Sequence, residues 1–200
     1  TVRTLSEINN YIYSISDKGL WINLYSGNEL QTTLLDGSNV KLQQKTNYPW
    51  AGNIEVIMDQ VPTHAFSLFL RIPAWAEKAT IKINEEVLNI DSTPGQYAQI
   101  NRVWKKGDNI ALTLPMETVL MQANPLVEES RNQVAVKRGP IVYCLESIDL
   151  PKGQSIFDVA LPSAIDFSSS MQTIENSKIL CLQGEAELVD SAKDWAGKLY

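Results

Sequence analysis

The sequence predicts an all-β protein made of antiparallel β-sandwiches, preceded by one N-terminal helix. Two observations carry this prediction. Apolar and polar residues alternate with a period of two in one short segment after another. Turn-forming Gly, Pro, Asn and Asp separate those segments at spacings of about 8 to 12 residues. Both patterns are typical of half-buried antiparallel strands with one face toward a core and one toward water.

The first 16 residues differ from the rest because their apolar residues recur at helical spacing. Four of them would share one helix face: Leu5, Ile8, Ile12 and Ile15. Thr4 and Glu7 also have the spacing of a capping box. We therefore expect a helix over residues 1–16. Its apolar stripe needs a partner, either the sandwich itself or a helical domain outside the sequence.

The alternating segments define the expected strands in order. The first group comprises residues 20–25, 40–43, 54–58, 66–72, 81–83 and 110–114. Asp36-Gly37-Ser38-Asn39 lies between two of these segments, as a hairpin connection would. A polar interruption between Met116 and Asn132 indicates a domain boundary. Later strands are expected at residues 133–138, 141–146, 179–182 and 185–189.

Charge and hydropathy exclude several partners. The chain has 17 basic and 23 acidic side chains and a net charge of −6. A nucleic-acid-binding protein needs a cationic face that displaces counterions, so no nucleic-acid partner is expected. The negative charge also disfavours anionic lipid surfaces. No segment approaches the ~20 apolar residues of a membrane-spanning helix, so no membrane partner is expected.

Residues that could carry out chemistry are few. His64 is the sole histidine and has no recognisable nucleophile or orienting partner, which favours a surface or structural role. Cys144 and Cys181 lie in apolar segments and are expected to be buried free thiols. Glu85-Glu86 and Glu128-Glu129 are adjacent in sequence, and adjacent strand residues point to opposite faces. Neither is the facing carboxylate pair of a glycosidase. No zinc or calcium pattern is present, so we assign no catalytic, cofactor-binding or metal-ligating residue.

The five tryptophans offer one alternative, because exposed indole rings can stack on sugar rings. Trp50, Trp75 and Trp104 lie near predicted turns and are the candidate sugar contacts. Packing in the core or at an edge of the sandwich is favoured over ligand stacking for most of the five. A carbohydrate-binding module requires these three indoles to be exposed in a row or cleft.

Five separated segments resemble a known family. They are Gly19-Leu20-Trp21-Ile22-Asn23-Leu24-Tyr25, Thr46-Asn47-Tyr48-Pro49-Trp50-Ala51-Gly52, Leu70-Arg71-Ile72-Pro73-Ala74-Trp75-Ala76, residues 102–108 with 112–116, and residues 134–146. In this order and spacing the chain resembles glycoside hydrolase family 127, the β-L-arabinofuranosidase-like enzymes. The likeness runs from about residue 1 to 150 and is weaker from 150 to 200.

The resemblance implies that catalysis belongs to another part of the parent protein. Members of the family have a helical (α/α)6 barrel that carries catalysis, followed by β-sandwich domains. Their retaining mechanism uses a cysteine thiolate nucleophile near zinc and a glutamate acid/base. The nucleophile lies in a Cys-Cys-Pro-Pro-Asn stretch before a segment that resembles Thr1–Tyr13. The chain is therefore expected to start downstream of the nucleophile. Cys144 and Cys181 do not match the catalytic cysteines.

The resemblance also divides the chain. Residues 1–17 would be the last helix of the barrel, residues 18–116 the middle β-sandwich, and residues 117–200 a truncated C-terminal β domain. The chain would have a structural role and no glycosidase activity of its own. It would bind no cofactor, and the parent would bind zinc. The expected partners are the catalytic barrel and a second copy through the β domains. The family resemblance implies a soluble protein of the bacterial cytoplasm or periplasm. An adhesion or interaction sandwich is a third hypothesis without positive support.

Overall fold

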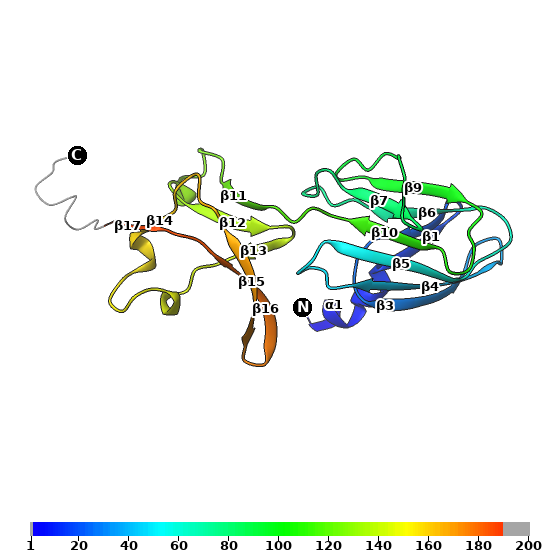
Figure 1. Ribbon diagram of the computed structural model, residues 1–200, viewed down its shortest axis with the longest axis horizontal. Helices are drawn as coiled ribbons and strands as arrows, with labels where there is room; N and C mark the ends of the chain where they lie inside the picture. The colour runs from blue at the N-terminus through cyan, green and yellow to red at the C-terminus, as the bar shows by residue number, and fades with distance from the viewer. Residues whose placement is uncertain (1, 190–200) are drawn as a thin grey trace, which may run out of the picture. The chain divides into compact units, whose positions relative to one another are not determined.

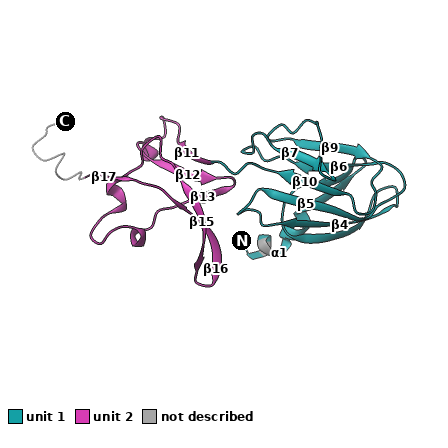
Figure 2. Ribbon diagram, viewed as in Figure 1, with its two compact units in different colours: residues 1–117 teal, residues 118–200 magenta. Residues whose placement is uncertain are grey.

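The chain forms two compact units in a computed structural model that describes residues 2–189. Unit 1 is Thr1–Glu117 and unit 2 is Thr118–Tyr200 (Figure 2). Every hydrogen-bonded sheet of the described residues lies within one unit. Among residues 2–189, no helix combines the length and the apolar character that crossing a bilayer requires.

Unit 1 is a sandwich of two sheets (Figure 1). The smaller sheet has the order β1-β2-β6-β9 and the larger the order β3-β4-β5-β10-β7-β8. Its elements are α1 (Val2–Glu7), η1 (Ile8–Tyr11), β1 (Tyr13–Ser16), β2 (Gly19–Ile22), β3 (Asn28–Thr33), β4 (Asn39–Thr46), β5 (Asn53–Gln60), β6 (Phe66–Arg71), β7 (Thr80–Ile83), β8 (Glu86–Val87), β9 (Tyr97–Arg102) and β10 (Asn109–Thr113). The predicted all-β sandwich is confirmed.

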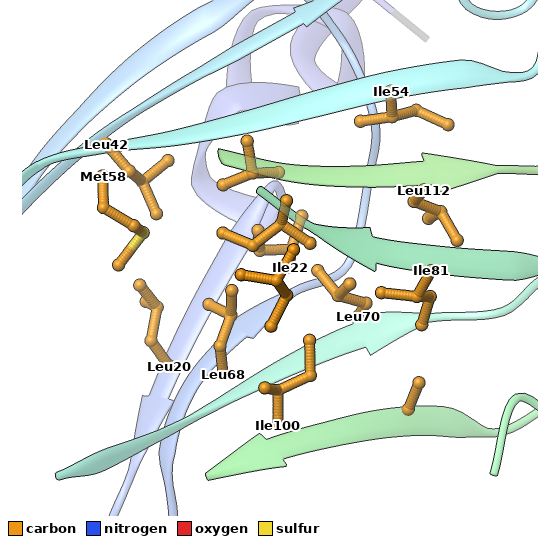
Figure 3. Packing of buried hydrophobic residues seen from close by; sticks show 14 of the residues in the cluster. Leu20, Ile22, Leu42, Ile54, Met58, Leu68, Leu70, Ile81, Ile100 and Leu112 are labelled. Carbon is orange, nitrogen blue, oxygen red and sulfur yellow. The ribbon is translucent and has the colours of Figure 1, made fainter. Parts of the chain in front are cut away.

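The core of unit 1 lies between the two sheets (Figure 3). Alternate residues of β5 are buried, and the residues between them are exposed or half-buried, as a period of two requires. The same alternation recurs along β4 and β10. The largest fully buried aliphatic side chains are Leu20, Ile22, Leu42, Ile54, Met58, Leu68, Leu70, Ile72, Ile81, Ile110 and Leu112. Burial of a leucine or isoleucine of this kind contributes about 1.5 to 3 kcal/mol to folding.

One pair of neighbouring strands departs from the antiparallel pattern. β2 pairs with β6 in parallel, with Gly19 opposite Ser67 and Ile22 opposite Leu70. Gly19 has φ +137°, and a Cβ built on it would lie 2.1 Å from the carbonyl oxygen of Ser67. Glycine is therefore required here, both for the backbone conformation and for the close approach of the two strands.

The N-terminal helix is shorter than predicted. α1 ends at Glu7, the 3₁₀ turn η1 follows, and residues 13–16 form strand β1 instead of continuing the helix. β1 pairs antiparallel with β2 around the turn at Asp17 and Lys18, and Ile15 packs against the sandwich core. Pairing with β2 decides the conformation here, because tertiary contacts override a weak helical preference in a short segment.

The predicted hairpin at residues 36–39 connects β3 and β4. The Leu34 amide donates to the Ser38 carbonyl (2.8 Å), and the Asp36 carboxylate accepts from the Ser38 amide (2.8 Å). Gly37 takes φ +84°, a value that glycine adopts without strain. The sequence thus specifies this turn locally.

Unit 2 is built from small sheets. Their orders are β11-β12-β13, β14-β17 and β15-β16. The elements are β11 (Thr118–Gln122), η2 (Glu128–Ser130), β12 (Val134–Arg138), β13 (Ile141–Tyr143), η3 (Ser147–Asp149), η4 (Ile156–Asp158), β14 (Val159–Ala160), β15 (Ser168–Ile174), β16 (Ser177–Gln183) and β17 (Glu187–Leu188). Leu180, at 8% exposure, is the one buried hydrophobic side chain among the described residues of this unit.

Candidate functional site

Trp104 belongs to the core. Its side chain is 2% exposed, and its Nε1 donates to the carbonyl oxygen of Phe66 (3.1 Å). The Phe66 ring packs at a tilt, with centroids 6.1 Å apart, and the Arg102 guanidinium lies 5.5 Å from the indole centroid. This burial removes Trp104 from the candidate sugar contacts, because no face of the indole is open to a ligand.

Trp50 and Trp75 are both half-buried, and they come from different connections. Trp50 follows Tyr48-Pro49 in the β4–β5 connection, where its backbone amide donates to the Asn47 carbonyl (2.9 Å). Trp75 lies in the turn after β6 and packs against the sandwich core. A sugar contact at either indole stays a prediction.

A different set of aromatic rings gathers on the outer face of the β1-β2-β6-β9 sheet. Trp21 stacks on Phe69, with centroids 3.8 Å apart and an interplanar angle of 6°. Tyr97 meets Trp21 edge-on, with centroids 4.9 Å apart and an angle of 82°. Leu20 and Ile22, which flank Trp21, are fully buried, so Trp21 points away from the core. Phe69 is only 5% exposed because the indole covers it.

Two amide side chains extend these aromatic rings. Gln99 lies opposite Phe69 and Asn101 lies opposite Ser67 in the β6–β9 ladder. The Oγ of Ser67 accepts from Gln99 Nε2 (3.0 Å) and from Asn101 Nδ2 (2.8 Å). Each amide thus uses an N–H group for the sheet. Their carbonyl oxygens accept no hydrogen bond from residues 2–189, and both side chains are exposed.

Hydrogen bonds hold the rings of this face in place. Trp21 Nε1 donates to Ser16 Oγ (2.9 Å), and the Tyr97 hydroxyl donates to Asn23 Oδ1 (2.8 Å). Asn23 Nδ2 in turn donates to Ser14 Oγ (2.7 Å). We call Trp21, Tyr97, Gln99 and Asn101, with Phe69 beneath them, the outer aromatic–amide face. Side chains fixed in this way lose little further freedom when something binds to them.

His64 forms an exposed tie between two loops. Its Nε2 lies 2.7 Å from Asp36 Oδ2, and both side chains are about half exposed. Hydrogen bonds from the Ser38 hydroxyl and amide lower the pKa of Asp36 to about 2, and His64 adds a smaller effect. The prediction of a surface or structural histidine is consistent with this placement, since the contact joins His64 to a turn carboxylate.

Asp108 is buried in the turn between β9 and β10. It accepts from Asn84 Nδ2 (2.9 Å) and from the Lys105 amide (2.9 Å), with Arg102 Nη2 at 4.0 Å. Burial raises the pKa of Asp108, but these hydrogen bonds and the two basic side chains outweigh burial and hold its pKa below the ordinary value. The Asp108 carboxylate therefore stabilises the turn through these hydrogen bonds.

Neither cysteine is fully buried. Cys181 is half-buried in β16, and Cys144 is exposed, which corrects the expectation of two buried thiols. Strand β13 ends at Tyr143, so Cys144 lies beyond it in a unit with little core. Residues 2–189 contain no group of three or more His, Cys, Asp and Glu side chains placed to hold a metal ion. The zinc that the resemblance implies for the parent's catalytic domain stays a prediction.

Two family models match successive parts of the chain. The model described as "Beta-L-arabinofuranosidase, GH127 middle domain" matches residues 19–116. The model described as "Glycoside hydrolase family 127 C-terminal domain" matches residues 118–188. The chain belongs to glycoside hydrolase family 127. The resemblance that the sequence segments carried is therefore confirmed.

Individual relatives within family 127 agree. A curated non-reducing end β-L-arabinofuranosidase of Bifidobacterium longum subsp. longum is 32% identical over 155 residues, which is 74% of this chain and 23% of that protein. A solved glycoside hydrolase superposes with a TM-score of 0.92 at 44% identity, over 100% of this chain and 33% of its own. Ara127N-Se, a GH127 β-L-arabinofuranosidase of Geobacillus stearothermophilus T6, gives 0.88 at 36% identity, over 99% of this chain and 31% of its own. The chain thus spans a third or less of these relatives.

Sequence reasoning missed the outer aromatic–amide face of this family 127 chain. A signal was available, because Trp21 and Phe69 occupy the water-facing positions of strands whose other face is apolar. Large rings at water-facing positions mark a surface that something covers. Of the three tryptophans chosen near turns, Trp104 is buried in the core, and a sugar contact at Trp50 or Trp75 stays a prediction.

Proposed function

We propose that this chain is the non-catalytic β-sandwich portion of a family 127 glycoside hydrolase. The parent would hydrolyse non-reducing-end β-L-arabinofuranosides or related plant glycans with retention, and zinc would belong to the parent's catalytic domain. The support is the match of residues 19–116 and 118–188 to the middle and C-terminal domains of the family. The arabinofuranosidase names of the relatives support the substrate class.

The residues of the chain support a structural role. Among the described residues, the buried polar side chains are Gln44, Ser67 and Asp108. Gln44 Nε2 donates to the Tyr13 hydroxyl (2.8 Å), and Ser67 and Asp108 accept from neighbouring side chains and a turn amide. Each group connects strands or turns of the sandwich. Such an arrangement gives a rigid body suited to bracing a neighbouring domain.

The exposed apolar side chains of unit 2 support a protein partner. Phe157 is 89% exposed and Leu126 is 86% exposed. Of the exposed large hydrophobic side chains among the described residues, 14 belong to unit 2 and 7 to unit 1. This excess supports a packing partner for unit 2, because apolar surface that gathers in one region is where another body packs. We assign this role to the parent's catalytic barrel and to a second copy of the chain through the β domains, in a soluble bacterial protein of the cytoplasm or periplasm.

The decisive experiment compares three proteins on an aryl β-L-arabinofuranoside. The 200-residue chain alone is expected to give no turnover above buffer. A protein that joins this chain to its upstream reading frame, in which we expect a Cys-Cys-Pro-Pro-Asn stretch, should hydrolyse the substrate. The same protein with the first or second cysteine of that stretch changed to alanine is the control. Turnover by the 200-residue chain, or an active parent that retains full activity after both changes, would overturn the proposal.

A further inference from the structure

We propose that the outer aromatic–amide face of unit 1 binds a neutral oligosaccharide. This surface is built by strands β2, β6 and β9 and consists of Trp21, Tyr97, Gln99 and Asn101 over the buried ring of Phe69. It is a binding role separate from hydrolysis and does not depend on the structural role proposed above.

The aromatic rings supply the apolar part of the site. Trp21 and Tyr97 stand at nearly a right angle, 82°, and so form an aromatic corner. The carbon-bound hydrogens of a sugar ring are apolar and weakly positive, and they pack against the negative faces and the bodies of aromatic rings. Phe69 fixes the indole from beneath, and the bond from Trp21 Nε1 to Ser16 Oγ fixes its rotation. A preorganised corner of this kind binds with little entropic loss.

The two amides supply the polar part. Gln99 and Asn101 each donate an N–H group to Ser67 Oγ, which orients both side chains on the sheet. Their carbonyl oxygens are left as acceptors toward solvent. Sugar hydroxyl groups are donors that fit such acceptors. Two oriented acceptors beside an aromatic corner match a ligand that alternates apolar ring faces and hydroxyl groups.

The charge of the face selects a neutral ligand. Among the outward positions of β1, β2, β6 and β9, Arg71 alone carries a charge at neutral pH. The Nε of Arg71 donates to the Asn23 carbonyl, so part of the Arg71 guanidinium is already hydrogen-bonded within the protein. In the whole chain, the 17 basic and 23 acidic residues make up 40 of 200 residues, or one in five. The outward positions of this sheet carry a smaller share of charged side chains. An anionic polysaccharide would find few cations there, and the chain's net charge of −6 would repel it.

The test is native affinity electrophoresis of the 200-residue chain in gels with and without polysaccharide. Arabinan and arabinoxylan are the neutral probes, and polygalacturonate is the anionic probe. The neutral probes are expected to retard the chain, and polygalacturonate is not. Calorimetric titration with arabino-oligosaccharides then gives dissociation constants for the variants.

The variants separate the two parts of the site. Gln99→Ala combined with Asn101→Ala is expected to weaken binding about tenfold, since two acceptors are lost. Tyr97→Ala is expected to weaken it about fivefold through loss of one ring contact. Gln31→Ala is the matched control, because Gln31 is an exposed amide on β3 of the other sheet, and it should leave binding unchanged. Circular dichroism melts verify that each variant is folded.

Three outcomes would overturn the inference. One is absence of retardation by both neutral polysaccharides. That result would indicate that the face is a contact surface for another protein domain and does not bind sugar. The second is retardation that the Tyr97 and double amide variants leave unchanged. The third is equal or stronger retardation by polygalacturonate. Each reads binding alone, so hydrolysis by the parent neither supports nor weakens the result.

Discussion

Unit 1 and unit 2 differ in where their apolar side chains lie. Every buried hydrophobic residue that the structure describes belongs to unit 1 except Leu180. In unit 2, Phe157 and Leu126 are almost fully exposed. A sandwich with two facing sheets covers its own apolar surface, whereas small two- and three-stranded sheets cannot. The difference shows that the first unit has a core of its own, and it is the observation behind our proposal that another body packs on the second.

The sharpest test of this comparison places the same substitution in each unit. Leu70→Ala removes a fully buried side chain of unit 1 and is expected to lower the free energy of unfolding by about 2 to 5 kcal/mol. Leu126→Ala removes an exposed side chain of unit 2 and is expected to change it by less than about 0.5 kcal/mol. Urea unfolding monitored by far-ultraviolet circular dichroism, which reports on the strands of both units, measures both variants. Similar losses for the two variants would contradict the contrast.

The two units also offer a matched pair of glycines. Gly19→Ala would place a Cβ 2.1 Å from the Ser67 carbonyl oxygen and is expected to destabilise unit 1 by more than about 1 kcal/mol. Gly153→Ala meets no atom within 4 Å, although its φ of +90° is also strained for alanine. It should therefore have the smaller effect. Thermal unfolding followed by circular dichroism ranks the pair, and a reversed order would argue against the close approach of β2 and β6.

Asp108 is expected to make the stability of unit 1 depend on pH in the acid range. Its folded-state pKa is lowered, so its carboxylate stabilises the fold at pH values above the ordinary value of about 4. That contribution is lost as the pH falls through the folded pKa. Asp108→Asn should lower stability at neutral pH and flatten the acid side of the stability curve. Urea midpoints measured between neutral and acidic pH test this, and an unchanged acid slope would exclude the role.

Phe157→Ser tests the exposed surface of unit 2. The ring is 89% exposed, so its loss should leave the urea midpoint nearly unchanged. It should lower the fluorescence of a hydrophobic dye bound to the chain and reduce self-association in sedimentation experiments. A matched substitution at exposed Val87 of unit 1 should change dye binding less. A large loss of stability in the Phe157 variant would show that this ring belongs to a core.

The smallest expected effect concerns the Asp36 turn. The pKa of Asp36 is lowered to about 2, first by the Ser38 hydroxyl and amide and less by His64. Ser38→Ala should therefore raise the pKa of Asp36 more than His64→Ala does. Carboxylate chemical shifts followed by NMR titration measure the difference. A larger rise in the His64 variant would reverse the assigned order of causes.

Much of the fold was predictable because it follows local patterns. The alternation along residues 54–58 corresponds to β5, and Asp36-Gly37 forms the hairpin turn. Two features were not predictable locally. Residues 13–16 form a strand because β2 lies beside them, and β2 pairs with β6 in parallel across the chain. Helical spacing in a short segment carries no information about such neighbours.

The candidate site was predicted less well than the fold. The family resemblance was recognisable from five segments, yet of the three chosen indoles Trp104 is buried, and Trp50 and Trp75 are half-buried. Burial of Trp104 depends on the Phe66 carbonyl oxygen and the Arg102 guanidinium, which come from elsewhere in the chain. The stacking of Trp21 on Phe69 likewise depends on the parallel register of two distant strands.

The parallel ladder between Gly19–Ile22 and Phe66–Arg71 has a kinetic consequence. Three strands of the opposite sheet, β3 to β5, are traversed between its two members. Closing that long loop costs conformational entropy before the contacts between β2 and β6 can form. Topologies rich in such distant contacts therefore fold more slowly. We expect β3, β4 and β5 of the larger sheet to pair first, and the β1–β2 hairpin to pair with β6 late. During synthesis, β1 and β2 would therefore stay without their β6 partner until residues 66–71 have been made.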